Sequence, residues 1–149
     1  MADLDDLRRH AAIDMGLAVV ATTRTDGSVH QSVVNAGVVH HPLTGVEVVG
    51  FVVKSSAHKI ELMRQCGRAS LTFRRGYRWI AVEGRTDLVG PDGDESAAGI
   101  DMPDLLRAVF VALGGTHPDW DEFDRVMNED RRLAVLVHPD RIIGQPITD

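Results

Sequence analysis

The sequence has little of several features that would assign a protein class at once. Of its 149 residues only Cys66 is a cysteine, so no intramolecular disulfide can form, and no Cys/His spacing of the zinc type occurs. The longest apolar runs, such as Leu17–Ala21 and Val48–Val53, are too short to span a bilayer. The first residues, "MADLDDLRRHAA", lack the apolar core of a signal peptide. We therefore expect one cytoplasmic, soluble domain over residues 1–149, with no metal site and no contact with membranes.

Nucleotide motifs and an overall positive charge are also missing. Neither GxGxxG nor GxxxxGK[ST] occurs, which removes support for two common nucleotide-binding folds. The formal net charge is −6, which argues against a nucleic-acid partner. The segment from Lys54 to Arg85, however, holds eight basic and two acidic residues. Such a segment indicates either a small anionic ligand or a solvated basic face paired with acids elsewhere.

Turn signals and apolar alternation predict several consecutive strands and a few helices. Asp26-Gly27 and Arg75-Gly76 are placed as hairpin turns. Hairpin-linked strands in succession favour a mainly β (α+β) fold, an antiparallel barrel or sandwich with a few peripheral helices. The expected strands are Leu17–Thr23, Val29–His40, Val46–Lys54, two within Arg68–Val89, and Leu133–Pro139; the expected helices are Leu4–Ala12, one ending near Cys66, Asp101–Leu113 and Asp119–Arg132.

The helix that ends near Cys66 begins with charges of an unfavourable sign. Lys54 and Lys59 are the only lysines of the chain, and both lie at this helix start. A helix N-terminus carries about +0.5 charge and favours anions. With Ser56 as the N-cap, free backbone N–H groups, serine hydroxyls and Lys59 would bind a phosphate. The alternative is a plain serine cap with solvated lysines.

The strand Val29–His40 places two amides on one face. Side chains alternate along a strand, so Gln31 and Asn35 share a face with valines and Gly37. Buried amides need partners, and an amide offers both the donor and the acceptor that an imide edge requires. Gly37 would allow a close approach to the backbone. The two amides could equally cap a barrel end or face solvent.

Aromatic side chains are scarce, and two of them lie among arginines. Tyr77 and Trp79 neighbour Arg78, where they could stack on a planar anion or simply pack across a hairpin. No histidine, and no Ser-His-Asp set, is marked by a motif. Cys66 lies near a helix C-terminus and lacks the setting that activates a thiol. We therefore name no catalytic residue.

Four segments in order carry a family resemblance: "LAVVATTRTDGSVHQSVVN", "GFVVKSSAHKIELMRQCGRASLTF", "YRWIAVEGRTDLV" and "RRLAVLVHPDRIIG". Together they resemble the split β-barrel proteins related to pyridoxamine phosphate oxidase, which are FMN-binding-like in fold. Within that family they are most similar to the actinobacterial reductases that depend on the deazaflavin coenzyme F420. The chain departs from the family in "KSSAHK", where an arginine is common, and in the longer hairpin "HHPLTGVE".

The resemblance implies a homodimer with the cofactor, F420 or alternatively FMN, at the subunit interface. It implies an oxidoreductase that transfers a hydride to an electron-poor small molecule such as an enone, quinone or tetrapyrrole. A non-catalytic F420 carrier and a haem-binding relative remain as alternatives. By this resemblance the cofactor-binding residues are Gln31, Ser32, Val33 and Asn35 along the ring, Lys54, Ser55, Ser56 and Lys59 at the phosphate, and Arg78 and Trp79 from the partner chain.

Overall fold

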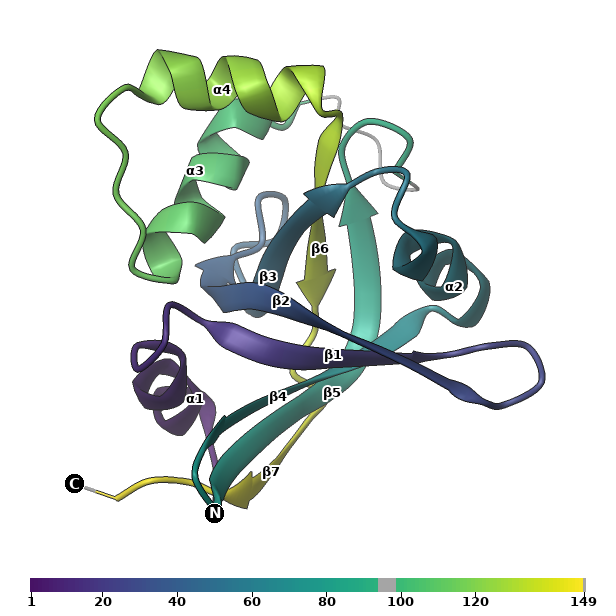
Figure 1. Ribbon diagram of the computed structural model, residues 1–149, viewed down its shortest axis with the longest axis vertical. Coiled ribbons are helices and arrows are strands. Elements are labelled where there is room, and N and C mark those ends of the chain that lie inside the picture. Colours follow the sequence, from purple (N-terminus) through teal and green to yellow (C-terminus); the bar gives the residue numbers. More distant parts are fainter. Residues whose placement is uncertain (94–98, 149) are drawn as a thin grey trace.

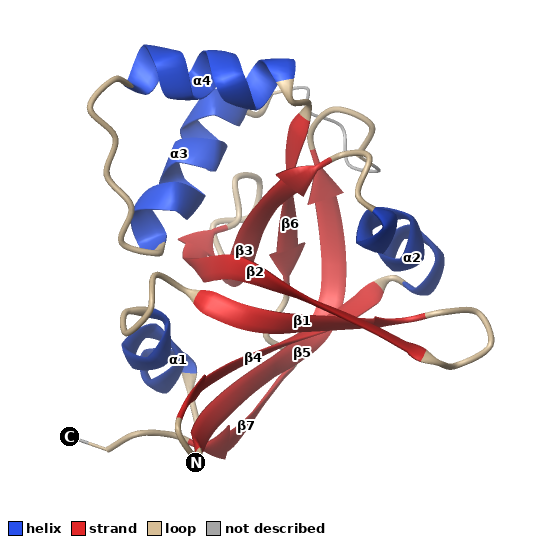
Figure 2. Ribbon diagram, viewed as in Figure 1, coloured by secondary structure: helices blue, strands red, loops and turns tan. Residues whose placement is uncertain are grey.

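A computed structural model describes residues 1–93 and 99–148 of the chain. Helices lie around an antiparallel sheet (Figure 2). The strands are β1 (Leu17–Thr23), β2 (Val29–His40), β3 (Glu47–Lys54), β4 (Arg68–Arg75), β5 (Arg78–Val89), β6 (Arg132–Val137) and β7 (Arg141–Gln145). The helices are α1 (Leu4–Ala11), α2 (His58–Cys66), α3 (Met102–Ala112) and α4 (Trp120–Glu129). Helix α2 separates β3 from β4 along the sequence, and α3 and α4 separate β5 from β6.

The sheet closes on itself into a barrel. The strand order is β4-β1-β2-β3-β6-β5, and β5 pairs again with β4 to close the ring, while β7 extends the sheet on the other side of β5. The long strand β5 makes this possible, since its first part pairs with β4 and β7 and its last part, Thr86–Val89, pairs with β6. The expected antiparallel split barrel with peripheral helices is therefore confirmed (Figure 1).

Strand β6 lies between two hydrophobic cores, which explains why it reads as a continuous apolar run. Leu133, Val135 and Val137 belong to the core inside the barrel. Ala134 and Leu136 point the other way, into a second core that lies beneath α3 and α4. A strand buried on both faces has no polar alternation, so the pattern "LAVLV" follows from this central position.

Helices α3 and α4 form a cap over one side of the barrel (Figure 1). Asp101 and Asp119 begin them as N-caps, each accepting hydrogen bonds from backbone N–H groups of the first turn, as carboxylates at helix starts favour. Gly37 of β2 lets α3 approach, because a Cβ at this position would lie 2.9 Å from the carbonyl carbon of Ala112. The close approach expected at Gly37 is thus made by a helix.

The last part of the chain differs in two ways from what the sequence predicts. The helix expected to reach Arg132 ends at Glu129, because Arg131 has a φ of 51° and Arg132 begins β6. The short strand β7 was not anticipated; it pairs with β5, and its Ile142 packs against the core inside the barrel. The segment "GPDGDESAAG", which its glycines and proline predict to be a loop, lies partly outside the described residues. In the described ranges no helix is both long and apolar enough for a membrane span.

Candidate functional site

The start of α2 leaves backbone donors free. Its N-cap is Ala57, not Ser56 as expected, and no side chain caps the helix. The chain reaches Ala57 in an extended conformation, with φ −63° and ψ 137°, and Ser56 lies one residue too early to cap. In the described part of the chain the N–H groups of His58 and Lys59 have no acceptor. Two N–H donors at a positive helix end form an arrangement that binds anions.

The two lysines beside this helix start lack counterions. Neither Lys54 nor Lys59 forms an ion pair with any residue that the structure describes. Lys59 is half-buried, and this burial lowers the pKa of its ammonium group. Burial also lowers the pKa of His30, whose ring lies 5.6 Å from that of His58, and the charges of Arg24, His58 and Lys59 add to this effect. The site therefore holds positive charge that an anion would stabilise.

These groups surround a pocket of about 380 Å³, which we call the lysine pocket. Among the residues expected to bind the cofactor, five line it: Val33, Asn35, Lys54, Ser56 and Lys59. Strand β2 supplies the first two, the end of β3 supplies Lys54, and the α2 start supplies the others. Its wall also contains Val52 and Arg132. The pocket thus joins a cationic end to an apolar wall bearing one amide.

The amide face of β2 is exposed over its first half. Gln31, Val33 and Asn35 are exposed, whereas Gly37 and Val39 on the same face are buried. Of the alternatives left open for these two amides, the structure shows exposure, because α3 covers only the second half of the strand. The Asn35 Nδ2 group donates a hydrogen bond to the Met15 carbonyl at 2.9 Å, which leaves the Asn35 Oδ1 atom facing outward as an acceptor.

The remaining residues that were expected to bind the cofactor do not line the lysine pocket. Gln31 and Ser32 lie before Val33, nearer the start of β2. The Ser32 Oγ atom is buried without a hydrogen-bond partner among the described residues. The Ser55 N–H group donates to the Arg131 carbonyl at 3.0 Å. Arg78 and Trp79 begin β5, on the β4–β5 hairpin, which Figure 1 shows at the end of the barrel near the N-terminus. None of these five residues lines the lysine pocket.

The basic segment does not form one surface. Arg85 forms a bidentate pair with Asp140, through Nε at 3.1 Å and Nη2 at 3.1 Å. These hydrogen bonds hold the pKa of Asp140 at about 2. Arg64 contacts Glu61 at 3.2 Å, and Arg78 lies on the distant hairpin. Part of the local charge is therefore structural, and the lysine pocket holds only a part of it.

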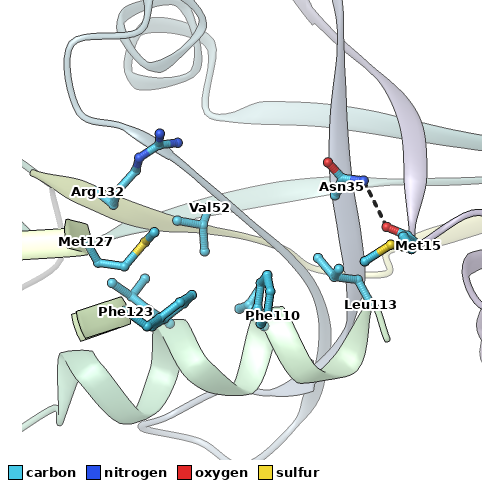
Figure 3. Close-up of a pocket in the computed structure, with 10 residues that line it drawn as sticks. Met15, Asn35, Val52, Phe110, Leu113, Phe123, Met127 and Arg132 are labelled. Carbon is cyan, nitrogen blue, oxygen red and sulfur yellow. Dashed lines mark hydrogen bonds between the residues drawn. The ribbon is translucent and has the colours of Figure 1, made fainter. Parts of the chain in front are cut away.

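A second pocket, of about 440 Å³, lies between the sheet and the α3–α4 cap, and we call it the apolar pocket. Phe110 and Phe123 stand on its helix side, with Arg132 at one end and Asn35 beside Met15 at the other (Figure 3). Asn35, Val52 and Arg132 line both pockets. The sequence did not single out Arg132, because the pattern placed it inside a helix. Its position is set by β3–β6 pairing, which sets it opposite Lys54.

A separate cluster joins His41, Asp87 and His138. The Nε2 atoms of His41 and His138 lie 2.9 Å and 2.7 Å from the same oxygen, Asp87 Oδ2. Burial would raise the pKa of Asp87, but the hydrogen bonds from His138 and His41 outweigh it and lower that pKa. The Leu43 N–H group donates to His41 Nδ1 at 3.2 Å, so the proton of neutral His41 lies on Nε2 and is donated to Asp87. This tautomer makes the cluster a hydrogen-bonded link between β5 and two loops.

No protein-family model matches the sequence. Solved structures share its fold, among them a conserved hypothetical protein of Mycobacterium tuberculosis with 18% identity and a TM-score of 0.70, covering 98% of this chain and 86% of that one. A pyridoxamine 5'-phosphate oxidase-related, FMN-binding protein of Nostoc punctiforme has 12% identity and a TM-score of 0.63, covering 93% of this chain and 78% of that one. An F420 reductase has 15% identity and a TM-score of 0.57, covering 90% of this chain and 94% of that one. The fold is therefore that of the pyridoxamine phosphate oxidase-like proteins, as the resemblance in sequence implied.

Proposed function

We propose that this split β-barrel protein is an F420-dependent oxidoreductase that reduces an electron-poor small molecule. The observation that carries the proposal is the lysine pocket, in which Lys54 and Lys59, without an ion-pair partner among the described residues, meet the uncapped start of α2. An FMN-binding protein and an F420 reductase share the fold. Both cofactors combine a flavin-like ring with a phosphate, which such a pocket could hold. F420 carries a phosphate and an acidic glutamate tail, so it matches a site with several uncompensated cations better than FMN does.

The residues of the lysine pocket fit such a cofactor at both of its ends. Lys59 and the N–H groups of His58 and Lys59 would hold the phosphate, with Lys54 and Ser56 beside them. Val33 and Val52 would contact the apolar face of the ring, and Asn35 Oδ1 would accept a hydrogen bond from its imide N–H. When bound in reduced form, F420 supplies the hydride.

The chain's own contribution to the reaction would be placement. The apolar pocket opens beside the ring position, since Asn35 and Val52 line both pockets. An acceptor held there would contact the ring while the walls exclude water, which favours transfer between two positioned groups. The anion that hydride transfer leaves on the acceptor would take its proton from solvent after the transfer, so the reaction requires no catalytic acid in the protein.

We further infer a homodimer. The outer face of β1 and β2 exposes a row of apolar side chains, with Val19 41% exposed and its cross-strand neighbour Val33 60% exposed. Leu17 and Val29 continue this row along the same two strands. A contiguous apolar face is typical of a surface that another protein covers. A second copy on this face would lie beside Val33 and Asn35, where its Arg78 and Trp79 could complete the cofactor site.

Fluorescence titration with F420 and with FMN tests the cofactor assignment. We expect F420 to bind the wild-type protein more tightly than FMN does. In Lys59→Ala the affinity for F420 should fall about tenfold to a hundredfold, which corresponds to one charge-assisted hydrogen bond of roughly 1.5–3 kcal/mol. The matched control is Arg125→Ala, which removes an exposed cation that pairs with Glu129 on α4 and should leave the affinity unchanged.

Tight FMN binding without F420 binding would contradict the proposal, and an unchanged Lys59→Ala affinity would remove the phosphate assignment. A Soret band after addition of haem would point to the haem-binding alternative. Turnover separates enzyme from carrier: reduced F420 is mixed with the protein and a panel of enones, quinones and biliverdin. If no acceptor is reduced although F420 binds, the protein is a carrier.

A further inference from the structure

Arg132 stands where three pockets meet. It lines the lysine pocket, the apolar pocket and a third pocket of about 300 Å³ next to Met102 and Pro103. As the first residue of β6 it is the backbone partner of Lys54 on β3. The pairing of two strands thus places a guanidinium group at the boundary between the proposed cofactor position and the space under α3 and α4.

The guanidinium of Arg132 is poorly paired among the residues that the structure describes. Its Nη2 atom reaches Asp130 Oδ2 only at 3.5 Å, the outer limit for a hydrogen bond. Its Nε atom is buried and has no acceptor in the part of the chain that the structure describes. A buried donor without a partner costs roughly 1–3 kcal/mol. A ligand with an acceptor at this position would remove that cost.

The walls of the apolar pocket define the rest of such a ligand. Phe110, Phe123, Met127 and Leu113 surround a space large enough for a small aromatic molecule (Figure 3). Methionine and phenylalanine side chains favour flat, polarisable groups. Among the described residues that line this pocket there is no carboxylate, and Arg132 is the one charged side chain. An anionic group in this pocket would therefore be bound at the Arg132 end.

We propose that the apolar pocket binds planar, conjugated acceptors that carry a carboxylate, and that Arg132 is the residue that selects for this carboxylate. A guanidinium binds a carboxylate through two parallel N–H···O bonds, which an uncharged group of the same shape cannot replace. The assignment of the ligand as the acceptor rests on the proposed function. The binding of a flat carboxylate next to Arg132 does not, and it is tested without cofactor.

Isothermal titration calorimetry with 2-naphthoate and 2-naphthamide measures the selection directly. The two probes have the same aromatic body and differ in charge. We expect the wild-type protein to bind the naphthoate at least about tenfold more tightly than the amide. Arg132→Met should lower the naphthoate affinity by about tenfold to a hundredfold and leave the amide affinity within about twofold. Arg132→Lys keeps the charge without the planar guanidinium, so its affinity for the naphthoate should lie between those of the wild type and Arg132→Met.

The control is Arg125→Met, an exposed arginine of α4 that lines neither pocket, and it should bind both probes like the wild type. The proposal is overturned if the wild-type protein binds neither probe, binds both equally, or keeps its naphthoate affinity in Arg132→Met. The same variants are then titrated with F420. Loss of F420 affinity in Arg132→Met with unchanged naphthoate affinity would assign Arg132 to the cofactor instead. Failure of the wild type to bind F420, with naphthoate selection intact, would defeat the proposed function alone.

Discussion

At the scale of single residues, His10 links the two ends of the chain. It lies on α1, it is buried, and its Nε2 atom accepts a hydrogen bond from the Ile147 N–H group at 2.9 Å. Burial lowers the pKa of His10, while Asp6 acts to raise it and Arg9 to lower it further. Figure 1 shows α1 and the segment that follows β7 at the same end of the barrel. The neutral imidazole therefore stabilises this arrangement.

The free energy of unfolding should depend on pH through the protonation of His10. Because its pKa is lower in the folded than in the unfolded protein, its contribution is complete above the unfolded value of about 6.5 and is lost as the pH falls towards the folded value. His10→Gln keeps an acceptor for Ile147 but does not titrate. Between pH 7.5 and 5, the free energy of unfolding in urea should fall more in the wild type than in the variant. Equal losses in both proteins would exclude His10 as the cause.

At the scale of elements, α2 differs from the other helices in how it begins. Asp3, Asp101 and Asp119 cap α1, α3 and α4 through their side chains, whereas the N-cap of α2 is Ala57, whose side chain cannot cap the helix. A missing cap costs a helix about 1 kcal/mol. Functional sites often retain a local arrangement that does not favour stability, and here the free N–H groups lie next to Lys59.

Replacing Ala57 by serine should separate stability from binding. In Ala57→Ser the hydroxyl accepts a hydrogen bond from the first turn, so the free energy of unfolding should rise by about 1 kcal/mol. The same bond competes with a phosphate, so the affinity for F420 should fall. The matched control is Ala12→Ser, at the exposed C-terminal end of α1. It should change neither the free energy of unfolding nor the affinity for F420. An increase in both stability and F420 affinity would show that this helix start does not bind the cofactor.

At the scale of the whole molecule, the barrel is covered unevenly. Helices α3 and α4 bury one side of the sheet, including β6 and the second half of β2. The first half of β2 and the facing part of β1 keep apolar side chains exposed. Both proposed pockets border this uncovered face through Val33 or Asn35. Assembly and cofactor binding are therefore expected to depend on one another.

Introducing a charge into the exposed row should disrupt the dimer. We expect the wild-type protein to show twice the chain mass of 16.3 kDa in light scattering after gel filtration. Val19→Glu places a carboxylate opposite Val33, where burial of an unpaired charge is costly, and should give the monomer mass and weaker F420 binding. Val111→Glu, at an exposed valine on α3, is the control and should remain dimeric. A monomeric wild type would contradict the dimer.

Local chemistry in the sequence was sufficient for most strands. The alternation in Leu17–Thr23 and Val29–His40, with Asp26-Gly27 between them, predicts a hairpin that the structure reproduces with the same bounds. The helix expected to end near Cys66 does so, and the next residue, Gly67, has a φ of 71° that favours glycine. These features depend on neighbours along the chain, so the sequence alone determines them. It also indicated that Lys54 and Lys59 lie together at a helix start, because only a short turn separates them.

Only the tertiary structure decided which distant residues meet. Arg132 joins Lys54 through β3–β6 pairing, and Asp87 joins His41 and His138 across strands and loops. Strand β7 forms by pairing with β5. The side chains of β2 change from exposed to buried along the strand, at the point where α3 begins to cover it. Such contacts depend on how the barrel closes, and closure is stabilised by apolar burial over the whole chain rather than by any local pattern. The sequence therefore determined the elements and a cationic helix start, whereas barrel closure created the two adjoining pockets.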